Sequence, residues 1–329
     1  IPIPTSSNPM AQLLNTKDSS RDNLLGNANI SFDIFKGLSF RSSLGYNQIK
    51  SEEIDVRPNS AKSPSTNPTT ASRATLFGNN YVNSWIIEPQ LNYNTTLSKG
   101  KLDLLAGMTF QKSTSEYRNI RASNFNSDEL MKEISAASVF SISESSYIQY
   151  KYAAFFGRVN YNWQNKYLIN LTWRRDGSSR FGPGKQFANF GAVGGAWIFS
   201  EENFIKRNLP FISFGKVRAS YGVTGNDQIG DYKYMQLLTN NPSYQGVPTL
   251  LTSILANADY AWETNRKTEG AIELGLLKDR INLQIAYFRN RSSNQLVSLN
   301  LPISVGRGGL TGNLPAIVQN TGWEFEGTF

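Results

Sequence analysis

Pairs of carboxylates are the residues whose types and spacing come nearest to catalysis. Glu269 and Glu273 are four residues apart, and Glu324 and Glu326 are two apart. On a strand each pair shares one face, and a spacing of about 7 Å between i and i+2 is in the range of the paired acids that hydrolyse glycosidic bonds. A hydrated wall lined by acids explains the same pattern with fewer requirements, and we favour it.

Composition excludes most other kinds of catalytic site. The chain contains no His and no Cys. Without His there is no Ser-His-Asp triad and the commonest ligand of transition metals is missing; without Cys there is no thiolate nucleophile, disulfide or Cys-based zinc site. Only carboxylate-pair or Ser-Lys chemistry stays formally open. We therefore predict that the protein is not an enzyme and holds no cofactor and no metal.

A group of charged residues is a candidate for binding. It surrounds the sequence Gly177-Ser178-Ser179 and consists of Arg174, Arg175, Asp176 and Arg180. One interpretation is a polar clamp that contacts substrate. The interpretation that we favour is a loop held together by its own Arg–Asp pairs, with Ser and Asp turn chemistry at the end of a strand.

A second candidate is the aromatic content of segment 225–261 and the residue that follows it. The rings belong to Tyr232, Tyr234, Tyr244, Tyr260 and Trp262. Aromatic rings can stack on sugar faces and anchor protein interfaces without needing a charge. Packing of the loop against its neighbours explains them equally well, and both interpretations stay open.

Strands are the elements that must position these residues. In 167–174, Tyr167, Ile169, Leu171 and Trp173 alternate with polar residues, and this period of two is typical of a strand with one apolar face. The pattern predicts about eleven strands: 27–34, 38–47, 84–93, 102–111, 155–163, 167–174, 187–199, 216–223, 271–276, 281–287 and 316–329.

The predicted connections alternate between short and long. Short turns are expected at 35–37, 98–100, 164–166 and 278–279, the first and third being three-residue hairpins that place Gly37 and either Asn165 or Lys166 in the left-handed region. Long connections are expected at 51–72, 119–145, 177–186, 225–261 and 292–314; the link 200–211, in which Ser200 fits a helix N-cap before Glu201 and Glu202, predicts a short helical turn. Short turns at one end and long loops at the other are typical of an all-β, antiparallel up-and-down transmembrane β-barrel, here a partial wall of about eleven strands.

Aromatic residues near strand ends support a membrane wall. The predicted lipid-facing girdle consists of Trp85, Trp163, Tyr167, Trp173, Tyr221 and Tyr287, since amphipathic rings collect at the two membrane interfaces. Along the same strands, Phe155, Val159, Tyr161, Ile169 and Leu171 are expected to face outward, and Arg158, Asn160, Asn170, Thr172 and Arg174 inward. The alternative is that these rings form the core of stacked soluble sheets, in which case the protein is a soluble all-β carbohydrate-binding module.

Composition agrees with a membrane wall. Charged residues make up 18% of the chain, below the roughly 25% of soluble domains. The net charge of +8 comes from scattered Lys and Arg residues, so nucleic acid is not an expected partner. No stretch reaches 18 apolar residues in a row, which excludes a transmembrane helix in this segment. The chain opens at Ile1 and ends at Phe329 within an alternating stretch, so we expect a fragment, with residues 1–329 forming part of one barrel domain without signal peptide, plug or soluble domain.

Several motifs resemble one family. Residues 173–202 include Arg175-Asp176-Gly177-Ser178-Ser179-Arg180-Phe181-Gly182 and, further on, Gly195-Ala196-Trp197 before Ser200-Glu201-Glu202. Agreement continues in order at Asn23–Asn27 with Leu38–Ser43, at Lys216–Asn226, and at Trp262-Glu263 with Glu273–Gly275 and Asp279–Ile281. From about residue 20 onward the chain resembles the barrel of SusC/RagA-type TonB-dependent transporters. Asn320-Thr321-Gly322 departs from the basic N-[KR]-G of the family.

The resemblance implies a function that the pattern alone does not. Such proteins are importers in the outer membrane of Gram-negative bacteria that take up glycans or peptides. They are energised by the TonB complex, through regions absent from this segment, and pair with a SusD-like surface lipoprotein. Partners implied for this chain are therefore that lipoprotein, the TonB complex, outer-membrane lipid and a glycan or peptide substrate, and the Arg174–Arg180 clamp could then touch substrate or plug.

Overall fold

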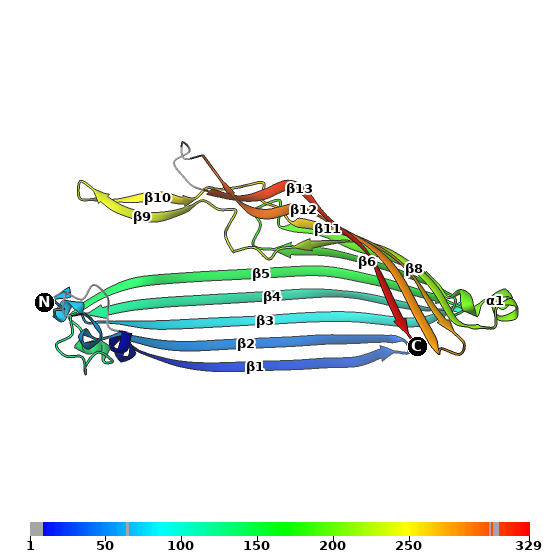
Figure 1. Cartoon of the computed structure of the whole chain (residues 1–329), viewed down its shortest axis with the longest axis horizontal. Helices are drawn as coiled ribbons and strands as arrows, with labels where there is room; N and C mark the ends of the chain where they lie inside the picture. The colour runs from blue at the N-terminus through cyan, green and yellow to red at the C-terminus, as the bar shows by residue number, and fades with distance from the viewer. Residues whose placement is uncertain (1–8, 64–65, 303, 305–308) are drawn as a thin grey trace. The chain divides into compact units, whose positions relative to one another are not determined.

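The computed structural model describes residues 9–63, 66–302, 304 and 309–329. Nearly all of them are in strands or in the connections between strands (Figure 1). No helix within these residues has the length and apolar character needed to cross a bilayer. The sequence prediction of an all-β fold is confirmed.

Eleven strands form one antiparallel sheet in which chain neighbours are also spatial neighbours, apart from one step from β8 to β11. Pairing follows the order β1-β2-β3-β4-β5-β6-β7-β8-β11-β12-β13, so the predicted up-and-down topology and strand number are confirmed. The strands are β1 (Thr16–Phe35), β2 (Leu38–Arg57), β3 (Ala74–Leu97), β4 (Gly100–Ser123), β5 (Val139–Trp163), β6 (Tyr167–Ser178), β7 (Phe187–Trp197), β8 (Ile212–Asn226), β11 (Glu263–Leu276), β12 (Ile281–Asn300) and β13 (Gly309–Thr328).

Many strands are longer than the alternation predicts. Residues 51–57, 119–123, 139–145, 292–300 and 309–314, expected in long loops, belong to strands instead. In these parts polar residues are frequent, and the apolar residues that remain are few or fall on both faces of the strand, so the period of two is weak although the backbone ladder continues. The predicted loop 225–261 contains a separate two-stranded sheet, β9 (Leu237–Tyr244) with β10 (Val247–Ile254), closed by Gln245 and Gly246 at positive φ.

The short turns fall where they are expected, with changes in length. The β5–β6 turn has the three predicted residues, 164–166, and Asn165 has a φ of 57°, with Gln164 rather than Lys166 also left-handed. The β1–β2 turn has two residues, not three, because Phe35 is still part of β1; Gly37 has a φ of 90°, as this turn requires.

Short helical segments lie in the connections. They are η1 (Pro9–Leu14), η2 (Asn59–Ala61), η4 (Thr70–Ser72), η5 (Ile134–Ala136), η6 (Phe199–Glu201) and α1 (Asn203–Asn208). The helical turn predicted within 200–211 is confirmed, but its cap is not: Ser200 lies inside η6, and Glu202 precedes α1 without a side-chain capping bond. The Glu202 carboxylate instead accepts hydrogen bonds from Lys166 at 2.9 Å and Tyr167 at 2.8 Å.

The chain divides into two compact units, and the boundary crosses β1 to β5. The first unit comprises residues 1–28, 44–86 and 112–149; its core contains Val56, Ala122, Phe125, Met131 and Ala137. The second comprises residues 29–43, 87–111 and 150–329; its core contains Phe181, Phe190, Tyr260 and Trp262. The candidate site lies entirely in the second unit.

Candidate functional site

The strand register of the second unit sorts side chains onto two faces. Leu171 pairs with Val159 on β5 and with Val193 on β7, and Val193 pairs with Tyr221 on β8. The face that carries Leu171 is called the apolar face here. Thr172 pairs with Arg158 and Ala192 on the opposite, polar face, since paired residues share a side of the sheet. The predicted division of 155–173 into two faces is thus observed, with Phe155 standing opposite Arg175 at the outer end of the apolar face.

Large side chains on the apolar face are exposed, not packed. Leu171 is 46% exposed and Trp173 52% exposed. Aromatic residues mark the edges of this face: Trp163, Tyr167 and Trp197 stand together near the short turns, with the Trp163 and Tyr167 rings 5.5 Å apart, and Tyr287 contacts Trp323 at 5.1 Å. Tyr221 and Trp173 lie further along β8 and β6, and Trp85 is exposed on β3 in the first unit. Contact of these rings with lipid remains a prediction.

The edge of the apolar band descends across the sheet. Following the register from Trp173 on β6 through Gly191, Val223 and Arg266 leads to Arg291 on β12. The aromatic edge on β12 is Tyr287, which is 291 − 287 = 4 residues lower after four strand steps. One residue of about 3.3 Å per inter-strand step of about 4.8 Å corresponds to a strand tilt of about 35° against the band. Transmembrane barrels have strand tilts of about 35–45°.

One group of charges on the polar face is mutually compensated. Arg218 on β8 donates to Glu273 at 2.9 Å and also to Glu269, and Lys216 lies 3.3 Å from Glu273. This geometry fits the hydrated polar wall that we favour for Glu269 and Glu273. Glu324 and Glu326 stand on the same face of β13, opposite Ala286 and Gln284.

Two residues of the predicted clamp, Arg174 and Asp176, lie at the end of β6 on the polar face. Arg174 on β6 donates to its strand neighbour Asp176 and to the hydroxyl of Tyr152 on β5. Its guanidinium stands 5.9 Å from the centre of the Tyr152 ring and 5.8 Å from that of Phe156. The predicted Arg–Asp pair within this segment is therefore present, and it is held against a neighbouring strand.

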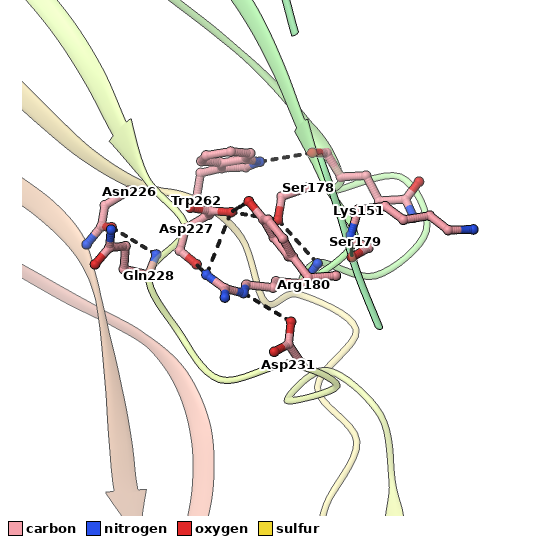
Figure 2. Close-up of polar contacts among 11 residues, drawn as sticks. Lys151, Ser178, Ser179, Arg180, Asn226, Asp227, Gln228, Asp231 and Trp262 are labelled. Atoms are coloured by element: carbon pink, nitrogen blue, oxygen red, sulfur yellow. Dashed lines mark hydrogen bonds and ion pairs between the residues drawn. The ribbon is translucent and has the colours of Figure 1, made fainter. Parts of the chain in front are cut away.

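Arg180 pairs with a different loop (Figure 2). Its Nε donates to Asp231 at 3.1 Å, and another nitrogen donates to the backbone oxygen of Asp227 at 2.9 Å. The Asp227 carboxylate accepts hydrogen bonds from Ser178 and Tyr150, both at 2.8 Å. Arg180 also stands 4.3 Å from the centre of the Tyr150 ring. These contacts fasten the β8–β11 connection to the β6–β7 connection, and we call them the Arg180 anchor.

Burial raises the pKa of two tyrosines of β5 beside these contacts. Tyr150 lies beyond the apolar band, on β5, where burial, followed by the hydrogen bond to Asp227, raises its pKa well above the ordinary value. Burial likewise raises the pKa of Tyr152 to about 12. Both hydroxyls are therefore neutral at physiological pH, and Tyr150 acts as a donor to Asp227.

An aromatic cluster lies beside the anchor. Phe181 contacts Trp262 at 4.8 Å and Tyr260 at 5.8 Å between ring centres, and Phe190 contacts Trp262 at 5.5 Å. The Trp262 indole donates to the backbone oxygen of Gln186 at 3.1 Å. Tyr260 is fully buried and its hydroxyl has no hydrogen-bond partner in the described part of the chain, so burial raises its pKa to about 12.

The predicted site residues thus have different environments. Arg174, Asp176 and Arg180 lie in the two polar networks; Tyr260 and Trp262 are buried, and Tyr234 packs against their cluster. Tyr232 is half-buried at a φ of 60°, and Tyr244 on β9 is 71% exposed. In this conformation the buried rings stabilise the loop, and a role in binding stays a prediction that suits Tyr244 best.

Sequence reasoning missed Tyr150, Asp227 and Asp231. Asp227 is 47 residues from Arg180, and Tyr150 is 77 residues from Asp227. No local spacing connects residues so far apart. The only available signal was that Asp227 directly follows the motif Thr224-Gly225-Asn226 at the end of a predicted strand.

Comparison with known proteins identifies similar chains. The family described as "TonB dependent receptor-like, beta-barrel" matches residues 3–329. TonB-dependent receptor P39 of Formosa agariphila is 31% identical over 304 residues, which is 90% of this chain and 28% of that protein. TonB-dependent receptor SusC of Bacteroides thetaiotaomicron is 31% identical over 180 residues, covering 52% of this chain and 18% of that protein. The chain thus spans about a third or less of the length of the curated relatives it matches.

Solved structures agree on the fold. The structure titled "Structure of the RagAB peptide transporter" superposes with a TM-score of 0.84 at 22% identity, covering 97% of this chain and 35% of that chain. At this identity the likeness shows the fold alone. Together with the family match and the two relatives, it confirms the resemblance stated from the sequence motifs.

Proposed function

The chain belongs to the TonB-dependent receptor-like β-barrel family, and on that premise we propose that residues 1–329 form part of the wall of a single outer-membrane barrel that imports oligomeric nutrients. The full protein would act as a transporter and not as an enzyme. Its expected location is the outer membrane of a Gram-negative bacterium.

The exposed apolar face carries this proposal. A soluble sheet buries such a face against a second layer, whereas here Leu171, Trp173 and Val193 are about half exposed. Lipid would cover this face, and the aromatic edges together with the tilt of about 35° fit the interfaces of a bilayer. The competing candidate, a soluble carbohydrate-binding module, offers no partner for these side chains.

The polar face supports a path for a hydrophilic substrate. It carries charged and amide side chains, among them the mutually compensated Arg218, Glu269 and Glu273. A hydrated lumen wall of this kind suits a glycan or a peptide, and the RagAB protein is titled a peptide transporter. Opening such a path needs an energy source, for which we propose the TonB complex acting through parts of the protein outside this segment.

The β9–β10 hairpin supports a contact at the mouth of the barrel. It projects as a separate sheet with exposed Leu238, Tyr244, Val247 and Leu250. Exposed apolar and aromatic residues on one projection favour a protein or glycan contact over water alone. We propose that it touches the substrate or a SusD-like surface lipoprotein.

Uptake by cells carrying the full-length gene tests the function. Accumulation of a labelled oligosaccharide or oligopeptide pool should require both this gene and TonB. Uptake that persists without TonB contradicts the transporter class. Purification distinguishes the transporter from the soluble carbohydrate-binding module. A full-length protein that stays monodisperse without detergent is not a membrane barrel.

A further inference from the structure

Three arginines stand on the apolar face just beyond its aromatic edge. They are Arg266 on β11 and Arg289 and Arg291 on β12. Tyr287 and Arg289 lie two residues apart on one strand, so they share a face, as do Arg289 and Arg291. Tyr287 also contacts Trp323 on β13, which fixes the position of the aromatic edge beneath the arginines. We call these three residues the arginine cluster.

The arginine cluster places two positive charges opposite each other, which is unfavourable in a sheet. Arg266 and Arg291 are directly opposite each other in the register. Like charges in such a pair repel each other, and a sheet normally places opposite charges there. Arg289 is two residues from Arg291, so all three guanidinium groups can reach one region.

Nearby groups on this face do not neutralise the cluster. Arg266 donates to the Ser293 hydroxyl at 3.4 Å, and Arg289 donates to the Gln319 side-chain oxygen at 3.0 Å. None of the three arginines forms an ion pair within the described ranges 9–63, 66–302, 304 and 309–329. The register neighbours on this face, Thr268, Thr321 and Gln319, are all uncharged. Each guanidinium thus keeps donors for an anion.

The distance of the arginine cluster from the aromatic edge, along the membrane normal, indicates which kind of anion it can reach. Arg291 is four residues beyond Tyr287, or about 10 Å along the membrane normal at a rise of 3.3 Å and a tilt of about 35°. The headgroup layer begins at the aromatic edge and extends roughly 5–8 Å from the hydrocarbon. Arg289, two residues beyond Tyr287, therefore lies about 5 Å from the aromatic edge, within the headgroup layer, and Arg291 reaches just above that layer, on the side of the sheet that the proposed function turns toward lipid.

We propose that the arginine cluster binds the phosphorylated sugar headgroup of an outer-leaflet glycolipid, a site separate from the transport path. Guanidinium groups bind phosphate with paired, charge-assisted hydrogen bonds, and two opposed arginines gain more from a shared phosphate than either gains from water. The Tyr287 and Trp323 rings below them contact the first part of the acyl region. This inference rests on the proposed outer-membrane placement.

The test uses the full-length protein reconstituted into phosphatidylethanolamine vesicles that contain lipid A with or without its phosphates. Retained glycolipid is counted by native mass spectrometry after extraction. The variants are Arg266→Gln, the triple replacement Arg266→Gln/Arg289→Gln/Arg291→Gln, and the matched control Lys267→Gln, whose residue neighbours Arg266 on β11 but faces the other side. Heat-modifiable migration on gels confirms that each variant has a folded barrel.

The wild type should retain phosphorylated lipid A over the dephosphorylated form, and Arg266→Gln should lower that retention about tenfold or more, the loss expected for one charge-assisted bond to phosphate. The triple variant should lose the preference, and Lys267→Gln should keep it. Equal effects of Arg266→Gln and Lys267→Gln overturn the proposal, as does equal retention of the two lipids. If inorganic phosphate competes as well as the lipid does, the site takes free phosphate and the lipid assignment is wrong. Loss of lipid preference in a protein that still inserts overturns this site alone, whereas failure of the wild type to insert overturns the proposed function as well.

Discussion

Leu171 and Thr172 are neighbours on β6 that face opposite sides of the sheet. If the apolar face contacts lipid, Leu171→Arg places a charge in hydrocarbon and should destabilise the full-length barrel by about 2–4 kcal/mol. Thr172→Arg places the same charge beside Arg158 on the polar face and should cost little. Urea unfolding of both variants in lipid vesicles measures the difference. Equal stabilities would mean that the orientation of the sheet is wrong.

A second prediction for a single residue concerns Tyr260, whose buried hydroxyl has no hydrogen-bond partner in the described structure. Burial raises its pKa from 10.0 to about 12. Since the folded-state pKa is the higher one, the neutral ring contributes stability that is complete below pH 10 and is lost as pH rises from 10 to about 12. The tyrosinate absorbance of the wild type minus that of Tyr260→Phe should therefore titrate near the upper value.

The Tyr260→Phe variant also removes an unsatisfied polar atom. At neutral pH the free energy of unfolding should stay level or rise, by up to about 1–3 kcal/mol, because no hydrogen bond is lost. Tyr150→Phe is the control, since that change removes the hydrogen bond to Asp227 and should destabilise the protein. A difference titration with a midpoint near 10.0, the ordinary value, would show that Tyr260 is accessible to water.

At the scale of elements, the sequence predicted the middle of each strand and missed its outer part. Alternation identified β6 almost completely, because Tyr167 to Trp173 face two different environments. It missed Ser51–Arg57 of β2, where Ile54 and Val56 are the two apolar residues among charged and polar ones. It also missed β9 and β10, which contain Pro242 and Pro248 and therefore resemble a loop. The Arg180 anchor needs residues from β5, β6, the β6–β7 connection and the β8–β11 connection, and only folding brings them together.

The two ends of the segment that carries the β9–β10 hairpin lie side by side, which makes a deletion possible. The Asn257 amide donates to the Tyr234 backbone oxygen at 3.1 Å, so the chain leaves and returns at the same place. Deleting 236–255 and joining the ends with a short Gly-Ser turn should leave Arg180, Asp227 and Tyr260 in place and the barrel assembled. Uptake, or capture of the proposed SusD-like lipoprotein, should fall strongly. Replacement of Tyr244 alone by Ala, in an intact hairpin, tests the exposed ring.

Unchanged uptake and unchanged partner capture by the deletion variant, with normal barrel assembly, would remove the role assigned to this hairpin. A barrel that no longer assembles would show instead that the hairpin stabilises the wall. The heat-modifiable migration of the barrel on gels separates these two results.

At the scale of the whole molecule, the described sheet has two ends, β1 and β13. Each offers unpaired backbone groups to other strands, and the apolar face adds a broad exposed surface. Residues 1–329 expressed alone in water should therefore aggregate, and detergent should be needed to keep them dispersed. Light scattering with and without detergent measures this. A monodisperse sample that unfolds cooperatively in plain buffer would contradict the membrane proposal.

The length of β12 has a consequence for how water reaches the sheet. Its 20 residues, Ile281–Asn300, extend well past the aromatic edge at Tyr287: the 13 residues beyond that edge rise about 35 Å at 3.3 Å per residue and a tilt of about 35°. This part of the ladder therefore stands outside the hydrocarbon, where backbone groups can exchange their hydrogens each time the ladder opens locally. The same strand should thus show two rates of amide exchange, slow from Ile281 to Tyr287 and faster beyond Arg291. The change from slow to fast exchange along one continuous strand would map the surface of the membrane residue by residue.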